Sequence, residues 1–164
     1  MLDSLFVTAS ATAVIEALGS ALGAAGSGDG GRRIAVVGHA KLAGALAAAR
    51  LGDAPLDVIP VGLSARAARK LPHALDDTST IAPRTLAAVV GVDVATDDTW
   101  ADTVAAWSRV VRDGGAIVLV DRGHAAEASR RALCAGLGEL EQRHAGRSVI
   151  TSGLVTHLET QTQT

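Results

Sequence analysis

The residues with the clearest potential for chemistry follow runs of apolar residues that have the length of β-strands. Gly38, His39, Ala40 and Lys41 come after residues 34–37, Gly62 after residues 56–61, and His124 after residues 116–121. Asp93 lies near the end of the run at residues 86–94. A buried strand that leads through a turn into a helix is a common site for phosphate or ribose. His124 is the candidate catalytic residue, a general base, because imidazole titrates near neutrality.

Other familiar site patterns are missing from the sequence. The residues His73, His144, His157 and Cys134 show no spacing typical of a metal site, so no metal is predicted. Lys41 lacks the spacing and the Ser or Thr of a phosphate-binding P-loop. Cys134 is the single cysteine, which excludes an internal disulfide, and its Ala-rich surroundings predict a buried small apolar residue.

The elements that must position these residues alternate between strand and helix. Apolar runs predict strands at residues 34–37, 56–61, 86–94 and 116–121, with two closing strands, the second at about 148–158. Helical spacing predicts helices at residues 10–22, 41–51, 64–71, about 98–111 and 125–136. This order predicts a three-layer α/β domain whose sheet is mostly parallel, with an antiparallel closing strand. Ligands of such sheets bind beyond the carboxyl ends of the strands.

The domain organisation follows from two Gly-rich or polar segments. Residues 1–31 are expected to form an N-terminal helix and a glycine-rich linker, and residues 32–158 the α/β domain. The polar end, residues 159–164, is expected to be disordered.

Composition limits the partners and the compartment. The net charge of −2 and the 2% aromatic content argue against nucleic acid as a partner. No run of 18 or more uninterrupted apolar residues is present, so no membrane partner is predicted. The N-terminus carries Asp3 and Glu16 and no early Lys or Arg, unlike an export signal. A cytoplasmic location is therefore expected.

Two strings resemble the class I methyltransferases that use S-adenosylmethionine. The first, LAAVVGVDVATDDTWADTVAAWSRVVRDGGAIVLVDRG, is similar to that family's fourth strand, its following helix, a Gly-Gly turn and a fifth strand that ends at an acidic residue. The second, AGLGELEQRHAGRSVITSGLVTHL, resembles the family's closing hairpin. The similarity extends from Ile34 to Leu158 and implies a Rossmann-like methyltransferase fold.

The resemblance also implies where a cofactor would bind, and here the sequence departs from the family. The family's first loop reads acidic-x-Gly-x-Gly-x-Gly, which falls on residues 36–42, where Val36 takes the acidic position and Gly38 alone of the three glycines remains. A ribose-binding acid ends the family's second strand, whereas this chain has Gly62. S-adenosylmethionine would contact Gly38, His39, Ala40, Lys41, Gly62 and Asp93.

These departures lead to one main hypothesis and two alternatives. The main hypothesis is a methyltransferase-like protein without efficient cofactor binding or catalysis, which acts as an interaction, regulatory or self-assembling subunit with a protein partner or a second copy of itself. The first alternative is an active methyltransferase that modifies a small molecule or a protein. The second is an NAD(P)-binding protein, because residues 38–43 also retain one glycine of the dinucleotide loop G-x-G-x-x-G.

Overall fold

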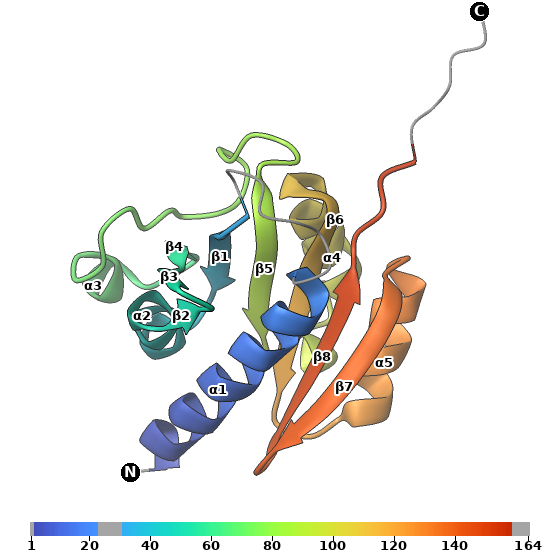
Figure 1. Ribbon diagram of the computed structural model, residues 1–164, viewed down its shortest axis with the longest axis horizontal. Coiled ribbons are helices and arrows are strands. Elements are labelled where there is room, and N and C mark those ends of the chain that lie inside the picture. Colours follow the sequence, from blue (N-terminus) through green and yellow to red (C-terminus); the bar gives the residue numbers. More distant parts are fainter. Residues whose placement is uncertain (1, 23–30, 159–164) are drawn as a thin grey trace, which may run out of the picture.

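A computed structural model describes residues 2–22 and 31–158 of the chain. The predicted disordered tail and most of the predicted glycine-rich linker lie outside the described residues. The described part forms a central sheet with helices on both faces (Figure 1).

The sheet has six strands in the order β4-β1-β5-β6-β8-β7. The strands are β1 Arg33–Val37, β4 Asp57–Val61, β5 Leu86–Val92, β6 Val111–Asp121, β7 Gly138–Ala145 and β8 Ser148–Leu154. The first four in that order run parallel, and β8 lies antiparallel between β6 and β7. The predicted α/β fold, with its mostly parallel sheet and antiparallel closing strand, is therefore confirmed.

Helices cover the two faces of this sheet. They are α1 Leu2–Leu22, α2 Ala40–Ala48, α3 Ala65–Ala68, the 3₁₀ turn η1 Val94–Thr96, α4 Trp100–Val110 and α5 Ala125–Cys134. One core cluster joins α1 and α2 to one face of the sheet, and a second joins α4 and α5 to the other. The alternation of side chains along β1, β5 and β6 supplies both clusters, because successive residues of a strand point to opposite faces.

Helix α1 is longer than predicted and belongs to the core of the domain. Val14, Ala17 and Leu18 are fully or almost fully buried, and they pack in the same cluster as Ile34 of β1 and Ile150 of β8. Figure 1 shows α1 lying across the sheet. By length and hydropathy the segment Ser4–Leu22 also meets the requirements of a membrane-spanning helix. Packing on the sheet uses part of this apolar surface.

The second predicted helix is shorter than expected. It ends at Ala48, because Arg50–Leu51 (β2) and Ala54–Pro55 (β3) form a small antiparallel hairpin. Arg32 donates a hydrogen bond to each of the Leu51 and Ala54 carbonyls, which holds this hairpin against the start of β1.

Tight packing near the middle of the sheet involves a glycine and a tryptophan. The indole of Trp107 in α4 lies so close to Gly91 of β5 that a Cβ atom there would meet the ring at 2.0 Å. Cys134, by contrast, is exposed, so the prediction of a buried cysteine was wrong. The buried face of α5 carries Ala128 and Ala132, and Cys134 is two positions further along the helix, which turns it away from that face.

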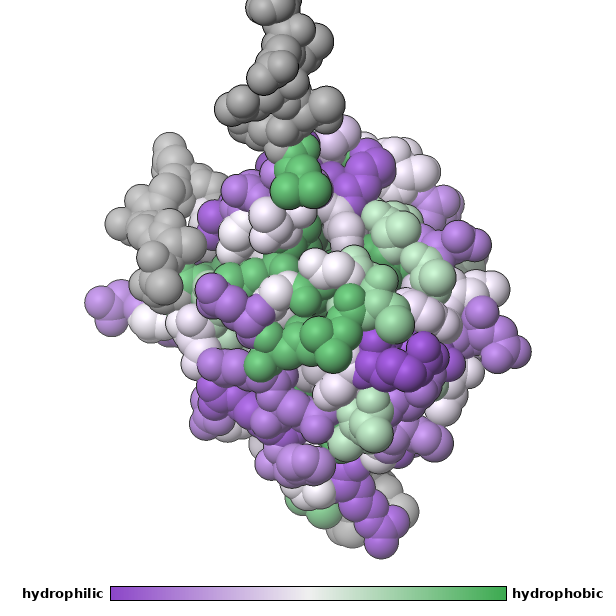
Figure 2. Space-filling view, turned by 90° about the vertical axis from the view of Figure 1, so that its right-hand side faces the viewer, coloured by the Kyte–Doolittle hydropathy of each residue, from purple (hydrophilic) through white to green (hydrophobic). Residues whose placement is uncertain are grey.

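The side of the molecule that carries β7 and α5 has an apolar area (Figure 2). Leu133 near the end of α5 is 62% exposed, and Leu140 of β7 is half-buried against the core. Strand β7 is last in the sheet, so its outer edge has no strand partner among the described residues.

Candidate functional site

The parallel strands bring the predicted site residues to one edge of the sheet. Gly38 and His39 follow β1, Gly62 follows β4, Asp93 follows β5, and His124 lies three residues beyond the end of β6. The chain passes from β1 to β4 on one side and then to β5 on the other. This reversal of direction beside β1 marks the crevice where ligands of open α/β sheets bind.

The turn between β1 and α2 depends on Gly38 and His39. Gly38 has a φ of +79°. Apart from its own chain neighbours, no atom of the described residues lies within 4 Å of the position that a Cβ would take there. The Gly38 N–H donates to the Val61 carbonyl at 2.8 Å. His39 is the N-cap of α2, and its Nδ1 accepts a hydrogen bond from the Leu42 N–H at 3.1 Å. Because that acceptor role requires Nδ1 to be unprotonated, His39 has a structural task at the candidate site.

The first turn of α2 departs from a glycine-rich cofactor loop. Ala40 is the first helical residue, and Leu42 is fully buried in the core. Val36, at the family's acidic position, is likewise fully buried among apolar side chains. Both changes strengthen the helix and the core, and neither supplies a polar group to a ligand.

The end of β4 is shaped by backbone hydrogen bonds. Gly62 has a φ of +68°, and its N–H donates to the Leu75 carbonyl at 2.9 Å. The Leu75 N–H in turn donates to the Pro60 carbonyl at 2.8 Å, so Leu75 forms an isolated parallel bridge with Val61. Gly62 presents no side chain here, and the nearest following polar residue is Ser64, whose Oγ accepts from the Ala67 N–H.

Two carboxylates, Asp93 and Asp121, lie near the ends of β5 and β6 and influence each other electrostatically. Asp93 is exposed in a left-handed conformation, with φ of 59°, and its N–H donates to the Val120 carbonyl. Asp121 is only 1% exposed, and its Oδ1 accepts from the Ala95 N–H at 2.9 Å, while its buried Oδ2 has no partner among the described residues. Burial raises the pKa of Asp121, and the nearby charge of Asp93 raises it further.

His124 stands at the start of α5 as an exposed residue with a φ of 58°. Its backbone carbonyl accepts the first hydrogen bond of the helix, from the Ala128 N–H, and its side chain makes no capping bond. His124 acts on Asp121 electrostatically and opposes the rise in the pKa of that carboxyl. The role of His124 as a general base stays a prediction.

Three residues that the sequence did not single out lie at this edge. The Phe6 ring of α1 lies 5.9 Å from the His39 ring, and the guanidinium carbon of Arg122 lies 4.5 Å from the centre of the Phe6 ring. Arg131 of α5 donates from Nη1 to the carbonyls of Val94 and Asp97 at 2.6 and 2.7 Å. Phe6 and Arg122 thus join α1 to the ends of β1 and β6, and Arg131 fixes the loop after β5.

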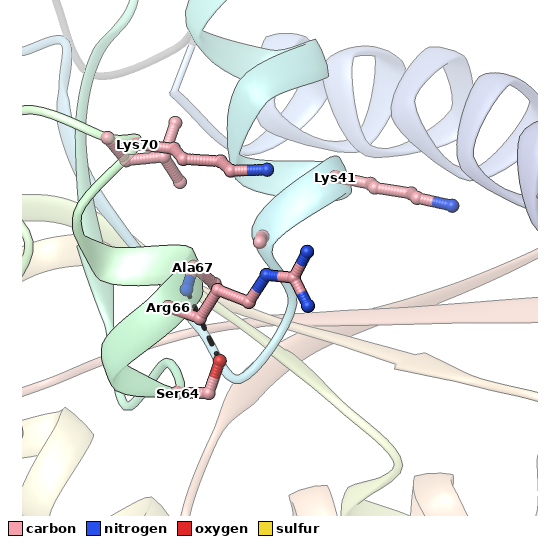
Figure 3. Close-up of a pocket in the computed structure, with 7 residues that line it drawn as sticks. Lys41, Ser64, Arg66, Ala67 and Lys70 are labelled. Atoms are coloured by element: carbon pink, nitrogen blue, oxygen red, sulfur yellow. Dashed lines mark hydrogen bonds between the residues drawn. The ribbon is translucent and has the colours of Figure 1, made fainter.

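A pocket of about 390 Å³ opens beside the β1 turn, between α2 and α3. Its lining residues are Ala40, Lys41, Ser64, Arg66, Ala67, Lys70 and Leu71. Figure 3 shows Arg66 and Lys70 extending from the α3 side toward the first turn of α2, and Lys41 pointing away from them on the far side of that turn. The lining contains basic side chains and no acidic one among the described residues.

Comparison with known proteins identifies the architecture. Neither protein-family models nor curated proteins match the sequence. Solved structures do match, among them a Methanococcus maripaludis protein provisionally named an S-adenosyl-L-methionine-dependent methyltransferase, with a TM-score of 0.67 at 12% identity over 96% of this chain and 90% of that one. This chain has the class I methyltransferase fold.

Two further structures support the same methyltransferase fold. Geranyl diphosphate methyltransferase in complex with S-adenosylmethionine gives a TM-score of 0.57 at 15% identity, over 88% of this chain and 85% of that chain. A chain from a complex that contains the Haloferax volcanii Trm112 methyltransferase activator gives a TM-score of 0.63 at 14% identity, over 89% of each chain.

Proposed function

We propose that this protein is a methyltransferase-fold subunit that does not catalyse methyl transfer and acts by binding a protein partner, in the first instance a second copy of itself. The proposal rests chiefly on the charge around the end of β4. The family places a ribose-binding carboxylate there, whereas this chain has Gly62 followed by the basic pocket of Arg66 and Lys70.

The loss of that carboxylate has a large expected effect on affinity. A hydrogen bond to a charged group contributes about 1.5 to 3 kcal/mol, and each 1.4 kcal/mol changes a dissociation constant about tenfold. S-adenosylmethionine also carries a positive sulfonium, which the neighbouring cations Arg66 and Lys70 disfavour. The residues at this edge therefore fit the cofactor poorly.

The contacts of Phe6 support the same conclusion. Its ring lies against His39 and Arg122 at the crevice beside β1, where the amino-acid part of the family's cofactor would approach Gly38. His39 is already engaged through Nδ1 in capping α2. A ligand at this position would have to compete with interactions that stabilise the folded protein.

The alternative of an active methyltransferase has support of its own. Gly38 keeps the positive φ and the open space of a turn glycine, and one structure with this fold holds S-adenosylmethionine. In that case Gly38, His39, Ala40, Lys41, Gly62 and Asp93 would contact the cofactor, and His124 would serve as the base.

Titration calorimetry with S-adenosylmethionine and S-adenosylhomocysteine separates the two proposals. For a non-catalytic subunit we expect no heat of binding at about 1 mM ligand. A dissociation constant below about 100 μM for either compound would contradict the proposal and favour the active enzyme.

Self-association is supported by the apolar area near β7 and by the charge pattern of that strand. In an antiparallel pairing of two copies centred on Gln142, Glu141 of each copy would lie opposite Arg143 of the other. This contact would add to the ion pairs of Arg143 with Glu16 and Glu141 of its own chain. Leu133, which is 62% exposed near the end of α5, would be covered in this proposed dimer. A structure with this fold also comes from a complex with a methyltransferase activator, which is consistent with a protein partner.

Light scattering tests the self-association directly. We expect the wild-type particle to have twice the mass of one chain, and Leu133→Asp to reduce it to a single chain. Leu158→Asp is the matched control, because Leu158 is 88% exposed and lies beyond the end of β8, outside α5 and β7. A wild-type protein that stays a single chain at all accessible concentrations would refute this part of the proposal.

A further inference from the structure

We propose that the basic pocket between α2 and α3 binds the phosphate of a nucleoside monophosphate or of a ligand that contains one. The pocket, defined by the seven lining residues Ala40, Lys41, Ser64, Arg66, Ala67, Lys70 and Leu71, has a volume of about 390 Å³. That volume lies within the range of small-molecule sites. The inference does not depend on whether S-adenosylmethionine binds, because it rests on the charge, the lining and the position of this pocket.

The charge of the pocket favours a phosphate. Arg66 and Lys70 approach the start of α2 from the same side, and neither side chain has a hydrogen bond or ion pair among the described residues (Figure 3). Lys41 adds a third positive charge at the rim. The positive charges of Arg66 and Lys70 in one pocket repel each other, and an anion between them relieves that repulsion.

The helix α2 adds to the positive potential. Its nine residues begin at Ala40, at the pocket wall, and no acidic residue lies in its first turn. The backbone N–H groups and the dipole of a helix N-terminus favour an anion. This contribution supplements the side chains of Arg66 and Lys70.

The pocket also has a place for the organic part of the ligand. Ala40, Ala67 and Leu71 provide apolar wall beside the cations, and Leu71 is held by contact with the core. A small hydrophobic wall with a few polar groups is typical of pockets that bind a base or a sugar.

Arginine near the end of the second strand of a dinucleotide-binding fold accommodates a phosphate at the ribose 2′ position, where an acid would accept the free hydroxyl. Here β4 is that strand in the order of the sheet, and Arg66 follows it closely in sequence. We therefore expect the pocket to prefer a ligand with a 2′-phosphate. A 5′-phosphate offers the same anionic group from another position on the ribose.

Titration calorimetry of the full chain with adenosine 2′-monophosphate, adenosine 5′-monophosphate, inorganic phosphate and adenosine tests the proposal at constant ionic strength. We expect the 2′-monophosphate to bind more tightly than the 5′-monophosphate, and adenosine not to bind. Equal binding of the two nucleotides would still support a phosphate site and would reject only the preference for the 2′ position. Binding of adenosine as tightly as its phosphates, or no binding of any phosphate at about 10 mM, would overturn the proposal.

Variants of α3 locate the site. Arg66→Ala is expected to weaken binding of the 2′-monophosphate about tenfold or more, and Arg66→Lys to weaken it less. Arg69→Ala is the matched control, since Arg69 is exposed at the end of α3 and does not line the pocket. An equal loss with Arg69→Ala would show a general charge effect and overturn the assignment. Because S-adenosylmethionine is titrated separately, failure here leaves the proposed function untouched.

Discussion

The guanidinium carbon of Arg122 lies 4.5 Å from the centre of the Phe6 ring. The two residues come from opposite ends of the fold, since Phe6 belongs to the first helix and Arg122 follows β6. The ring of His39 also lies next to the Phe6 ring. These contacts attach α1 to the carboxyl ends of the parallel strands. The N-terminal helix is thus part of the candidate site as well as of the core.

Removal of the Phe6 ring should weaken the attachment of α1. Phe6→Ala is expected to lower the free energy of unfolding by about 1 to 2 kcal/mol, because it removes half-buried apolar area and an exposed cation–π contact. Phe6→Leu keeps most of the apolar area and should cost less. Urea denaturation measures both variants, and an equal loss for the two would show that the ring itself contributes nothing.

The close approach of Trp107 to Gly91 leaves no room for a side chain at position 91. Gly91→Ala would place Cβ 2.0 Å from the indole, so we expect a loss of about 1 to 3 kcal/mol or more in the free energy of unfolding. Thermal and urea denaturation measure this loss.

A double variant and a control at another glycine test whether the clash with Trp107 causes this loss of stability. Trp107→Leu should make room for the new methyl group. The double variant is therefore expected to lose less free energy of unfolding than the sum of the losses of the two single variants. Gly44→Ala is the control, because Gly44 lies in α2 with nothing within 4 Å of its Cβ position, and alanine there should stabilise by about 0.5 to 1 kcal/mol. Strict additivity would reject the steric explanation.

Much of the fold was predictable because its strands are buried on both faces. Residues 86–92 and 116–120 are continuous apolar runs, which is the pattern of a central parallel strand. The hairpin of β2 and β3 was not predicted, because strands of two residues show no periodicity. The Ala-rich sequence before Arg50 favours a helix, so the predicted helix includes Arg50 and Leu51.

The candidate site was predictable only where it follows from strand ends. Gly38, Gly62, Asp93 and His124 reach one edge because parallel strands end on the same side. The contacts of Phe6 and Arg131 join residues far apart in the sequence, and no local pattern records such pairs. The one available signal was that Phe6 is the only phenylalanine in a sequence with 2% aromatic residues.

Arg131 should fix the loop that carries Asp93. Its side chain is 13% exposed, and it bonds to the carbonyls of Val94 and Asp97 and to Glu127 Oε1. Arg131→Ala leaves these carbonyls without their donor and is expected to cost about 1 to 3 kcal/mol. Arg131→Lys keeps the charge and loses the planar fork, so it should recover only part of this loss.

Hydrogen exchange gives a local reading of the same effect. Faster exchange is expected at the Ala95 and Asp97 amides in Arg131→Ala, because their hydrogen-bonded loop opens more often. Exchange that changes equally in the distant strand β1 would indicate global destabilisation and contradict a local role for Arg131.

The buried carboxyl of Asp121 should make the protein less stable as pH rises, whereas a carboxylate in an ion pair makes a protein less stable as pH falls. Burial raises its pKa from the usual value of 3.8, so the folded protein keeps the proton at pH values where the unfolded chain has lost it. The free energy of unfolding that this group contributes is therefore highest below 3.8 and falls as pH rises through the raised pKa. Asp121→Asn stays neutral and can still accept the bond from the Ala95 N–H, so it should remove this fall.

The difference between variant and wild type is the quantity to measure, by urea denaturation at about pH 3 and about pH 7. Asp97 and Glu127, whose pKa values are lowered by hydrogen bonds from Thr99 and from Arg130 respectively, make both proteins less stable in acid, and they cancel in this difference. Asp121→Asn is expected to be more stable than wild type at neutral pH and close to it in acid. The control is Asp98→Asn, at an exposed carboxyl on the same loop. The same difference at both pH values would mean that the charge of Asp121 is not the cause, because only a titrating group gives a difference that changes with pH.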